Sequence, residues 1–140
     1  MADTDAQSAR TPRLRHTALK VRDLERSIDF YSRVLGMYVT RRRDSVQRNH
    51  KAAYVAYGDE ATHHALELVQ DNDRPDKFVL GNLYWHINVS VPDLPRLCAK
   101  LKAEGIEFVE EPTPMTIDDR YHIAFVRDPD GYEVELTDYP

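Results

Sequence analysis

Residues 14–36 read LRHTALKVRDLERSIDFYSRVLG, and residues 84–105 read YWHINVSVPDLPRLCAKLKAEG. Each begins with the alternating apolar and polar residues that are typical of a half-buried strand. Each continues with an aspartate suited to cap a helix, Asp23 or Asp93, then apolar residues at helical spacing and a closing glycine. The two stretches therefore predict the same strand and helix, present twice in the chain.

Three further strands are expected after each helix. The candidates are residues 37–41, 52–57 and 65–70 in the first half, and residues 106–110, 121–127 and 132–137 in the second. Three successive strands favour antiparallel pairing over a parallel sheet in which strands and helices alternate singly. The sequence thus predicts an α+β fold of two tandem βαβββ modules that form a curved mixed sheet with a cleft.

The repeat also predicts the domain organisation. A polar, disordered tail is expected over residues 1–12, the first module over 13–71, a linker over 72–82 and the second module over 83–140. The linker is polar and contains Pro75, which disfavours regular structure. At 140 residues, the two modules together have the usual size of one compact domain.

Composition excludes several classes of protein. Apolar residues make up 41% and charged residues 31%, which is typical of a folded globular chain. A formal net charge of -5 argues against nucleic-acid binding. No apolar stretch resembles a signal peptide or a membrane span, and Cys98 is the only cysteine, so a cytoplasmic location is expected. Cys98 lies in an apolar helical stripe, which favours a small buried residue over a nucleophile.

Four candidate metal ligands occupy equivalent positions in the two halves. His16 and His86 are each third in the stretch that opens a module, and Glu67 and Glu135 lie in the last strand of each module. All four are flanked by apolar residues, so we expect them to point away from solvent into a concave surface. Buried carboxylates that face each other are unfavourable without a cation. Two imidazoles and two carboxylates suit one divalent cation such as nickel, cobalt, zinc or iron(II).

A run of arginines and four further histidines lie outside the set of candidate metal ligands. The run Arg41–Arg43, with Arg48 and Lys51 nearby, favours a solvated strand end, and a pocket for substrate carboxylates is the alternative. The remaining histidines fit the metal site less well: His63 and His64 are expected in an exposed loop, His50 in a polar connection and His122 in a strand. The sequence leaves open that any of them lines the mouth of the pocket.

Residues 15–37 closely resemble the opening of glyoxalase I, a member of the vicinal oxygen chelate superfamily. The resemblance extends over nearly the whole chain from Leu14, through residues 55–58, 66–68, 85–87 and 124–136. Its specific feature is the set His, Glu, His, Glu. Extradiol dioxygenases, fosfomycin-resistance enzymes and methylmalonyl-CoA epimerase typically differ from this set at one or more positions.

The resemblance implies a metal-dependent lyase. Its reaction converts the hemithioacetal of methylglyoxal and glutathione, or another small thiol, into the S-lactoyl thioester through an enediolate. The resemblance implies one divalent metal per site (nickel, cobalt or zinc, with iron or manganese as further options) and a homodimer whose sites join one chain's first module to the other's second. By position Glu135 is the catalytic base and Glu67 the second carboxylate. Lys20 and Asp71, which stand where an arginine and an asparagine are usual, are the substrate-binding candidates.

Two alternatives stay open at this point. One is a related metalloenzyme, an isomerase, epimerase or lyase, that acts on a substrate without glutathione. The other is a binding protein of the bleomycin-resistance kind, which needs no catalytic metal. Because the two modules are near copies, symmetry alone also leaves open whether Glu67 or Glu135 is the base.

Overall fold

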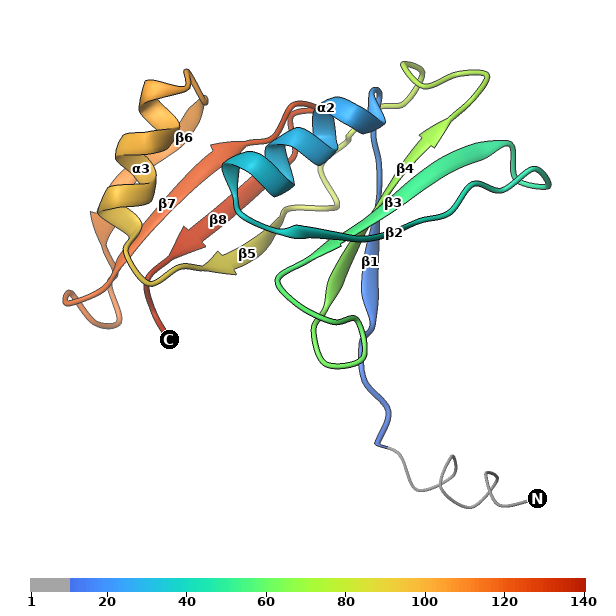
Figure 1. Ribbon diagram of the computed structural model, residues 1–140. Coiled ribbons are helices and arrows are strands. Elements are labelled where there is room, and N and C mark those ends of the chain that lie inside the picture. The colour runs from blue at the N-terminus through green and yellow to red at the C-terminus, as the bar shows by residue number, and fades with distance from the viewer. Residues whose placement is uncertain (1–10) are drawn as a thin grey trace.

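The computed structural model describes residues 11–140 (Figure 1). Residues 1–10, which make up most of the predicted tail, lie outside the described residues. Within residues 11–140, no helix combines the length and the apolar character needed to cross a bilayer.

Each half of the chain forms a βαβββ module. The first comprises β1 (His16–Lys20), α2 (Leu24–Asp29), the π-helix η1 (Phe30–Val34), β2 (Tyr38–Arg42), β3 (His50–Ala56) and β4 (Ala65–Asp71). The second comprises β5 (His86–Ser90), α3 (Leu94–Ala103), β6 (Phe108–Pro114), β7 (His122–Arg127) and β8 (Glu133–Thr137). The predicted order of elements is confirmed in both halves.

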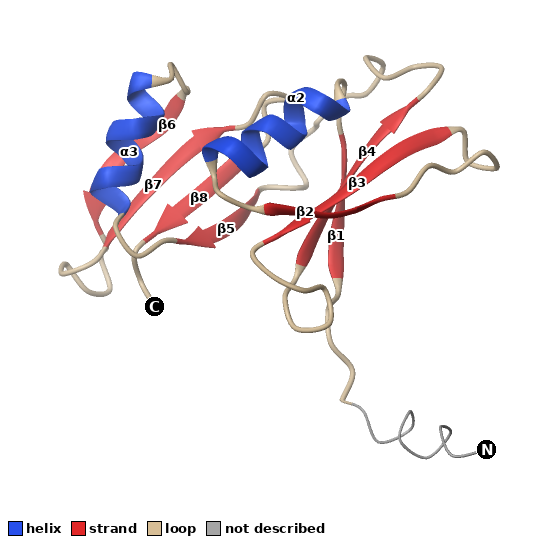
Figure 2. Cartoon of the chain, in the orientation of Figure 1, coloured by secondary structure: helices blue, strands red, loops and turns tan. Residues whose placement is uncertain are grey.

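The strands form two four-stranded mixed sheets with the same topology, β1-β4-β3-β2 and β5-β8-β7-β6. The first strand of each module pairs parallel with the last, and the other neighbours are antiparallel. The predicted α+β fold is therefore confirmed. Figure 2 shows α2 lying between the strands of the two modules and α3 lying against the second sheet.

Both helices begin as the sequence predicts. Asp23 and Asp93 each accept a hydrogen bond from the amide three residues later, at 3.1 Å. Gly36 and Gly105, which follow the helices, have φ of 82° and 74°, a region that glycine adopts without strain. The change from α- to π-helix at Phe30 was not predicted, because periodicity does not distinguish these two helix types over so few residues.

Several strand ends differ from the prediction. β6 extends to Pro114 instead of ending at residue 110, and His50 was assigned to the wrong element. His50 was expected in a polar connection but is the first residue of β3, because its backbone pairs with Asp71 of β4. His63 and His64 are exposed in the loop before β4, and His122 lies in β7, as expected.

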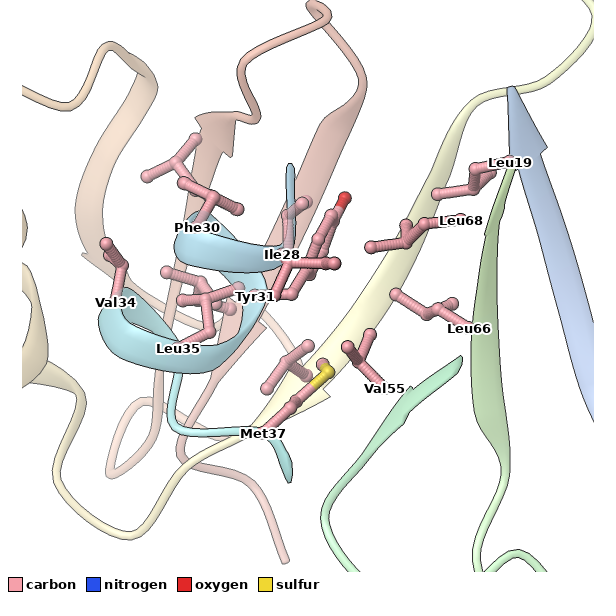
Figure 3. Packing of buried hydrophobic residues seen from close by; sticks show 14 of the residues in the cluster. Leu19, Ile28, Phe30, Tyr31, Val34, Leu35, Met37, Val55, Leu66 and Leu68 are labelled. Carbon is pink, nitrogen blue, oxygen red and sulfur yellow. The ribbon is translucent and has the colours of Figure 1, made fainter. Parts of the chain in front are cut away.

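The core is continuous across the two modules. Leu66, Leu68 and Val55 of the first sheet point toward α2 and η1, as Figure 3 shows. Apolar residues of β7, β8 and α3 belong to the same cluster. Cys98 is 2% exposed within it, which confirms its role as a small buried residue, and burial raises the pKa of its thiol.

The turn between β7 and β8 fastens the second module to the helix of the first. The Tyr31 hydroxyl donates to an Asp128 carboxylate oxygen at 2.7 Å, and the Ser27 hydroxyl donates to Asp130 at 3.2 Å. These four residues are buried, so the contact is part of the core. One face of each sheet is occupied by this packing, and functional side chains are therefore found on the other face.

Candidate active site

Strand alternation places the predicted ligands on the sheet face away from the core. In β4, Glu67 lies between Leu66 and Leu68, both of which point into the core. Successive side chains of a strand point to opposite faces, so Glu67 points to the other face. Residues directly opposite each other on neighbouring strands share a face. Tyr54 of β3, which pairs with Glu67, therefore belongs to the same surface.

The first module brings His16 and Glu67 together. His16 Nε2 lies 3.3 Å from Glu67 Oε2, and the two side chains are 38% and 17% exposed. The Tyr54 ring packs edge-on against the His16 ring, with centroids 5.4 Å apart. Burial raises the pKa of the Tyr54 hydroxyl, and the nearby Glu67 carboxylate raises it further. The ligand candidates of this module are thus held by one aromatic side chain and remain open to solvent.

The second module repeats this arrangement with closer contacts. His86 Nε2 lies 2.7 Å from Glu135 Oε2, and the side chains are 20% and 18% exposed. Phe125 pairs in register with Glu135, and its ring packs edge-on against His86 at 5.1 Å. Asn88 Nδ2 donates a 2.9 Å hydrogen bond to Glu135 Oε1. The expected burial of the ligands is therefore partial, and least at His16.

The structure joins each histidine to the glutamate of its own module. Within residues 11–140, no three histidine, cysteine, aspartate or glutamate side chains lie close enough together to hold one metal ion. The predicted four-residue set is thus present in one chain as two separate pairs, which we call the first half-site (His16, Glu67) and the second half-site (His86, Glu135).

The atoms in these half-sites fit a divalent cation. Each pair presents one imidazole nitrogen and one carboxylate oxygen, the donor types that first-row divalent metals bind. His86 Nδ1 is buried and has no hydrogen-bond partner among residues 11–140. The nitrogen of His86 that is available to a cation is consequently Nε2, which faces Glu135.

The predicted substrate-binding residues contact each other. Lys20 Nζ lies 2.5 Å from Asp71 Oδ1, and their side chains are 51% and 42% exposed. Both come from the strands that carry the first half-site, four residues beyond His16 and Glu67 respectively. The charge of Asp71 is therefore balanced by that of Lys20.

Sequence reasoning missed the aromatic partners of the two histidines. Ala53-Tyr54-Val55 and Ala124-Phe125-Val126 are equivalent tripeptides of β3 and β7, with an aromatic residue in the middle of each. The internal repeat therefore contained a signal for Tyr54 and Phe125. Asn88 had a weaker signal, two residues after His86 on the same face of β5.

The sequence and the fold are similar to those of known proteins. Residues 13–136 match the family described as the glyoxalase/bleomycin resistance protein/dioxygenase superfamily. The chain belongs to this superfamily. It is 45% identical to a lactoylglutathione lyase of Neisseria meningitidis over 124 residues, which are 89% of this chain and 88% of that protein. It is 41% identical to that of Shigella flexneri over 126 residues, 90% of this chain and 92% of that protein.

A solved structure agrees with these relatives. The trypanothione-dependent glyoxalase I of Leishmania major has a TM-score of 0.79 and 32% identity, covering 90% of this chain and 86% of that one. The resemblance to glyoxalase I is confirmed, and this superfamily member is a glyoxalase I-like lyase. The glyoxalase I family generally binds a divalent metal, and its enzymes act on a small-molecule thiol adduct.

Proposed function

We propose that this chain converts the hemithioacetal of methylglyoxal and a small thiol, glutathione or another, into the S-lactoyl thioester. His16, Glu67, His86 and Glu135 are the proposed ligands of one divalent metal, with nickel, cobalt or zinc as the candidates. The observation that carries the proposal is the pairing of one imidazole with one carboxylate on the open face of each sheet. The reaction is an isomerisation, so it needs no external oxidant or reductant.

We infer that a complete site forms between two chains. Each module supplies half of the ligands, and the two half-sites do not converge within the described part of a single chain. A homodimer in which the first half-site of one chain meets the second half-site of the other would supply all four ligands. Closed two-fold symmetry would then create two identical sites per dimer.

The chain's own side chains supply the proton transfer. The bound cation would act as a Lewis acid toward the two neighbouring oxygens of the substrate. Glu135 removes the proton from one carbon and returns it to the adjacent carbon. Its Oε1 is held by Asn88 at 2.9 Å, which fixes the plane of the carboxylate and the direction of Oε2. The choice of Glu135 over Glu67 as the base follows the resemblance to glyoxalase I, and the Asn88 contact orients its carboxylate.

One observation favours a second candidate function. Lys20 is already paired with Asp71, so its charge is not free to bind a carboxylate of glutathione. A lone ammonium also cannot form the bidentate contact of an arginine. An isomerase, epimerase or lyase of the same superfamily that uses a different thiol, or a substrate without one, is therefore the alternative.

The proposed reaction can be tested directly. Purified protein loaded separately with nickel, cobalt and zinc is given methylglyoxal with glutathione and with other small thiols, and thioester formation is followed by absorbance. We expect thioester formation with at least one thiol and about one metal ion per chain. Full metal loading without thioester formation for any thiol would favour the alternative function.

The cross-chain site has its own test. A His16→Ala chain is mixed with a Glu135→Ala chain and refolded together, so that about half of the dimers are heterodimers with one intact site of two. The mixture should recover about one quarter of the wild-type activity, whereas each variant alone should be nearly inactive. If mixing restores nothing although the heterodimers form, the sites lie within single chains.

A further inference from the structure

A polar cavity of about 310 Å³ opens beside the first half-site. It lies at the end of the β2–β3 hairpin, and His16 and Glu67 form one of its walls. The complete lining comprises His16, Arg43, Ser45, Gln47, Arg48, His50, Tyr54 and Glu67. A group bound in this cavity would therefore lie next to the proposed metal ligands.

Two of the hairpin arginines are already paired, and neither lines this cavity. Arg41 binds Glu60 at 3.0 Å and stacks on the Tyr54 ring, with its guanidinium carbon 3.7 Å from the ring centroid. Arg42 binds Glu25 at 2.6 Å. Such pairs neutralise the arginine charge, so Arg41 and Arg42 fit the predicted solvated strand end.

Arg43 and Arg48 differ from Arg41 and Arg42 both in their position and in their lack of an ion pair within residues 11–140. Both line the cavity, and neither guanidinium has an ion pair or a hydrogen bond to any residue of 11–140. Glu67 is the only acidic residue among the lining residues, and it is a proposed metal ligand. With a divalent cation balanced by the two proposed glutamate ligands, both arginine charges would remain uncompensated.

The hairpin holds these arginines in place. Ser45 and His50 form a backbone bridge, with N–O distances of 2.9 and 3.1 Å. The Arg48 amide donates to the Ser45 hydroxyl at 3.2 Å, which positions the residue within the turn. Asn49 closes the turn with a positive φ of 51°, and its side-chain oxygen accepts a 3.1 Å hydrogen bond from Asn72. The turn is therefore tied to the segment that follows β4.

The lining would suit an apolar substituent poorly. Tyr54 is its only aromatic residue, and the other members are charged, amide, hydroxyl or imidazole side chains. Guanidinium groups bind carboxylates through strong, charge-assisted hydrogen bonds. The cavity thus combines two guanidinium groups that have no partner in the described part of the chain, further polar donors and direct contact with the first half-site.

We infer that Arg43 and Arg48 bind a carboxylate of the substrate beside the metal site and thereby determine substrate specificity. The inference rests on the proposed function and narrows its substrate class to thiol adducts that carry a carboxylate. That carboxylate belongs either to the aldehyde or to the thiol. The chemistry recognised is the same for both sources, and the following experiment distinguishes them.

The test compares charged and neutral forms of each half of the substrate. The aldehydes are 4,5-dioxopentanoate, which carries a carboxylate, and uncharged 2-oxopentanal; the thiols are glutathione and uncharged N-acetylcysteamine. The variants are Arg43→Met with Arg48→Met, and Arg42→Met as the matched control, because Arg42 is paired with Glu25 outside the cavity. kcat/KM is measured for all four adducts, and circular dichroism checks that each variant is folded.

The double variant should lose about 10- to 100-fold in kcat/KM, mainly through KM, on adducts that carry the recognised carboxylate. It should keep wild-type values on the adduct with no carboxylate, and Arg42→Met should behave as wild type throughout. A loss that follows the aldehyde's charge assigns the carboxylate to the aldehyde, and a loss that follows glutathione assigns it to the thiol. Replacing both arginines by lysine should restore part of the loss.

Two results would overturn the inference: an equal loss on the uncharged adduct, or no loss on any adduct. If the double variant does not fold, kcat/KM of the wild-type enzyme is measured at increasing salt concentrations instead. Added salt should lower kcat/KM only for the charged adducts. An equal response of charged and uncharged adducts to salt would again contradict the inference. Failure of the wild-type enzyme on all four adducts would instead count against the proposed function.

Discussion

The two half-sites have the same arrangement of histidine, glutamate and aromatic side chain, but their surroundings differ. In both, a histidine of the first strand faces a glutamate of the last strand, and an aromatic residue of the third strand packs edge-on against the histidine. The His–Glu distance is 3.3 Å in the first half-site and 2.7 Å in the second. The first lies beside the arginine-lined cavity, whereas in the second Asn88 binds the glutamate.

The second half-site is also enclosed by aromatic rings. The Trp85 ring lies edge-on to His86, with centroids 4.5 Å apart, and stacks on Phe125 at 6.2 Å. Trp85 Nε1 donates to Glu133 Oε2 at 3.1 Å, which fixes the indole. The duplicated modules have therefore kept the ligand types while their surroundings have diverged. These differences agree with the proposed roles, in which residues beside the first half-site select the substrate and Glu135 of the second half-site transfers the proton.

The largest expected effect separates the two glutamates. Glu135→Gln keeps the size and one oxygen ligand but removes the base, so kcat should fall by about 10²–10⁴-fold while metal is largely retained. Glu67→Gln should reduce kcat less, since Glu67 is assigned to coordination. Steady-state kinetics and metal analysis of both variants give the comparison. Proton exchange at the substrate carbon that survives in Glu135→Gln but vanishes in Glu67→Gln would reverse the assignment.

A smaller effect is expected from the residue that supports Glu135. Asn88→Ala removes the hydrogen bond to Oε1 and should weaken metal affinity by about 10- to 100-fold, as loss of such supporting contacts typically does. Ser90→Ala is the matched control, because Ser90 lies two residues further along β5 and its hydroxyl donates to the Tyr139 carbonyl. Metal titration and thermal unfolding are measured for both. Equal metal affinity in the two variants would show that Asn88 does not position the ligand.

The smallest effect is expected on stability and concerns the β7–β8 turn. The connection between the last two strands is an exposed loop in the first module and a buried turn in the second. Burial raises the pKa of Asp128, although hydrogen bonds from Tyr31, Asp130 and Tyr132 oppose the shift. A raised pKa in the folded state means that protonation favours folding. This contribution is complete below the unfolded pKa of about 3.9 and is lost as pH rises through the folded value.

Asp128→Asn removes this titration. The free energy of unfolding of the wild-type protein minus that of the variant should therefore decrease as pH rises above about 4. Denaturant unfolding at a series of pH values measures the difference. A difference that stays constant or increases with pH would contradict the raised pKa.

The sequence predicted the order of elements well because periodicity, caps and closing glycines are local properties of the chain. Asp23, Asp93, Gly36 and Gly105 all act as expected. Strand ends were less predictable, as His50 shows. A strand continues as long as its neighbour offers backbone partners, and the pairing of His50 with Asp71 is a contact between residues far apart in sequence.

Contacts between residues far apart in sequence also limited what could be predicted about the site. The internal repeat identified His16, Glu67, His86 and Glu135, and it also contained the unused signal for Tyr54 and Phe125. Nothing in the run Arg41–Arg43 distinguishes its three members. Their difference arises because Glu60 and Glu25, distant in sequence, reach Arg41 and Arg42, whereas the Arg43 guanidinium at the cavity has no partner among residues 11–140.

Local patterns in the chain are enough to predict the two βαβββ modules, the residue types of the four ligand candidates and their equivalence in the two halves. The packing of the elements brings each histidine to the glutamate of its own module. It also leaves the guanidinium groups of Arg43 and Arg48, beside the first pair, without a partner among residues 11–140. The physical reason is the range of the interactions. Alternation and helical spacing record which face of an element is buried, whereas charge pairing depends on distances that are fixed only when the elements pack.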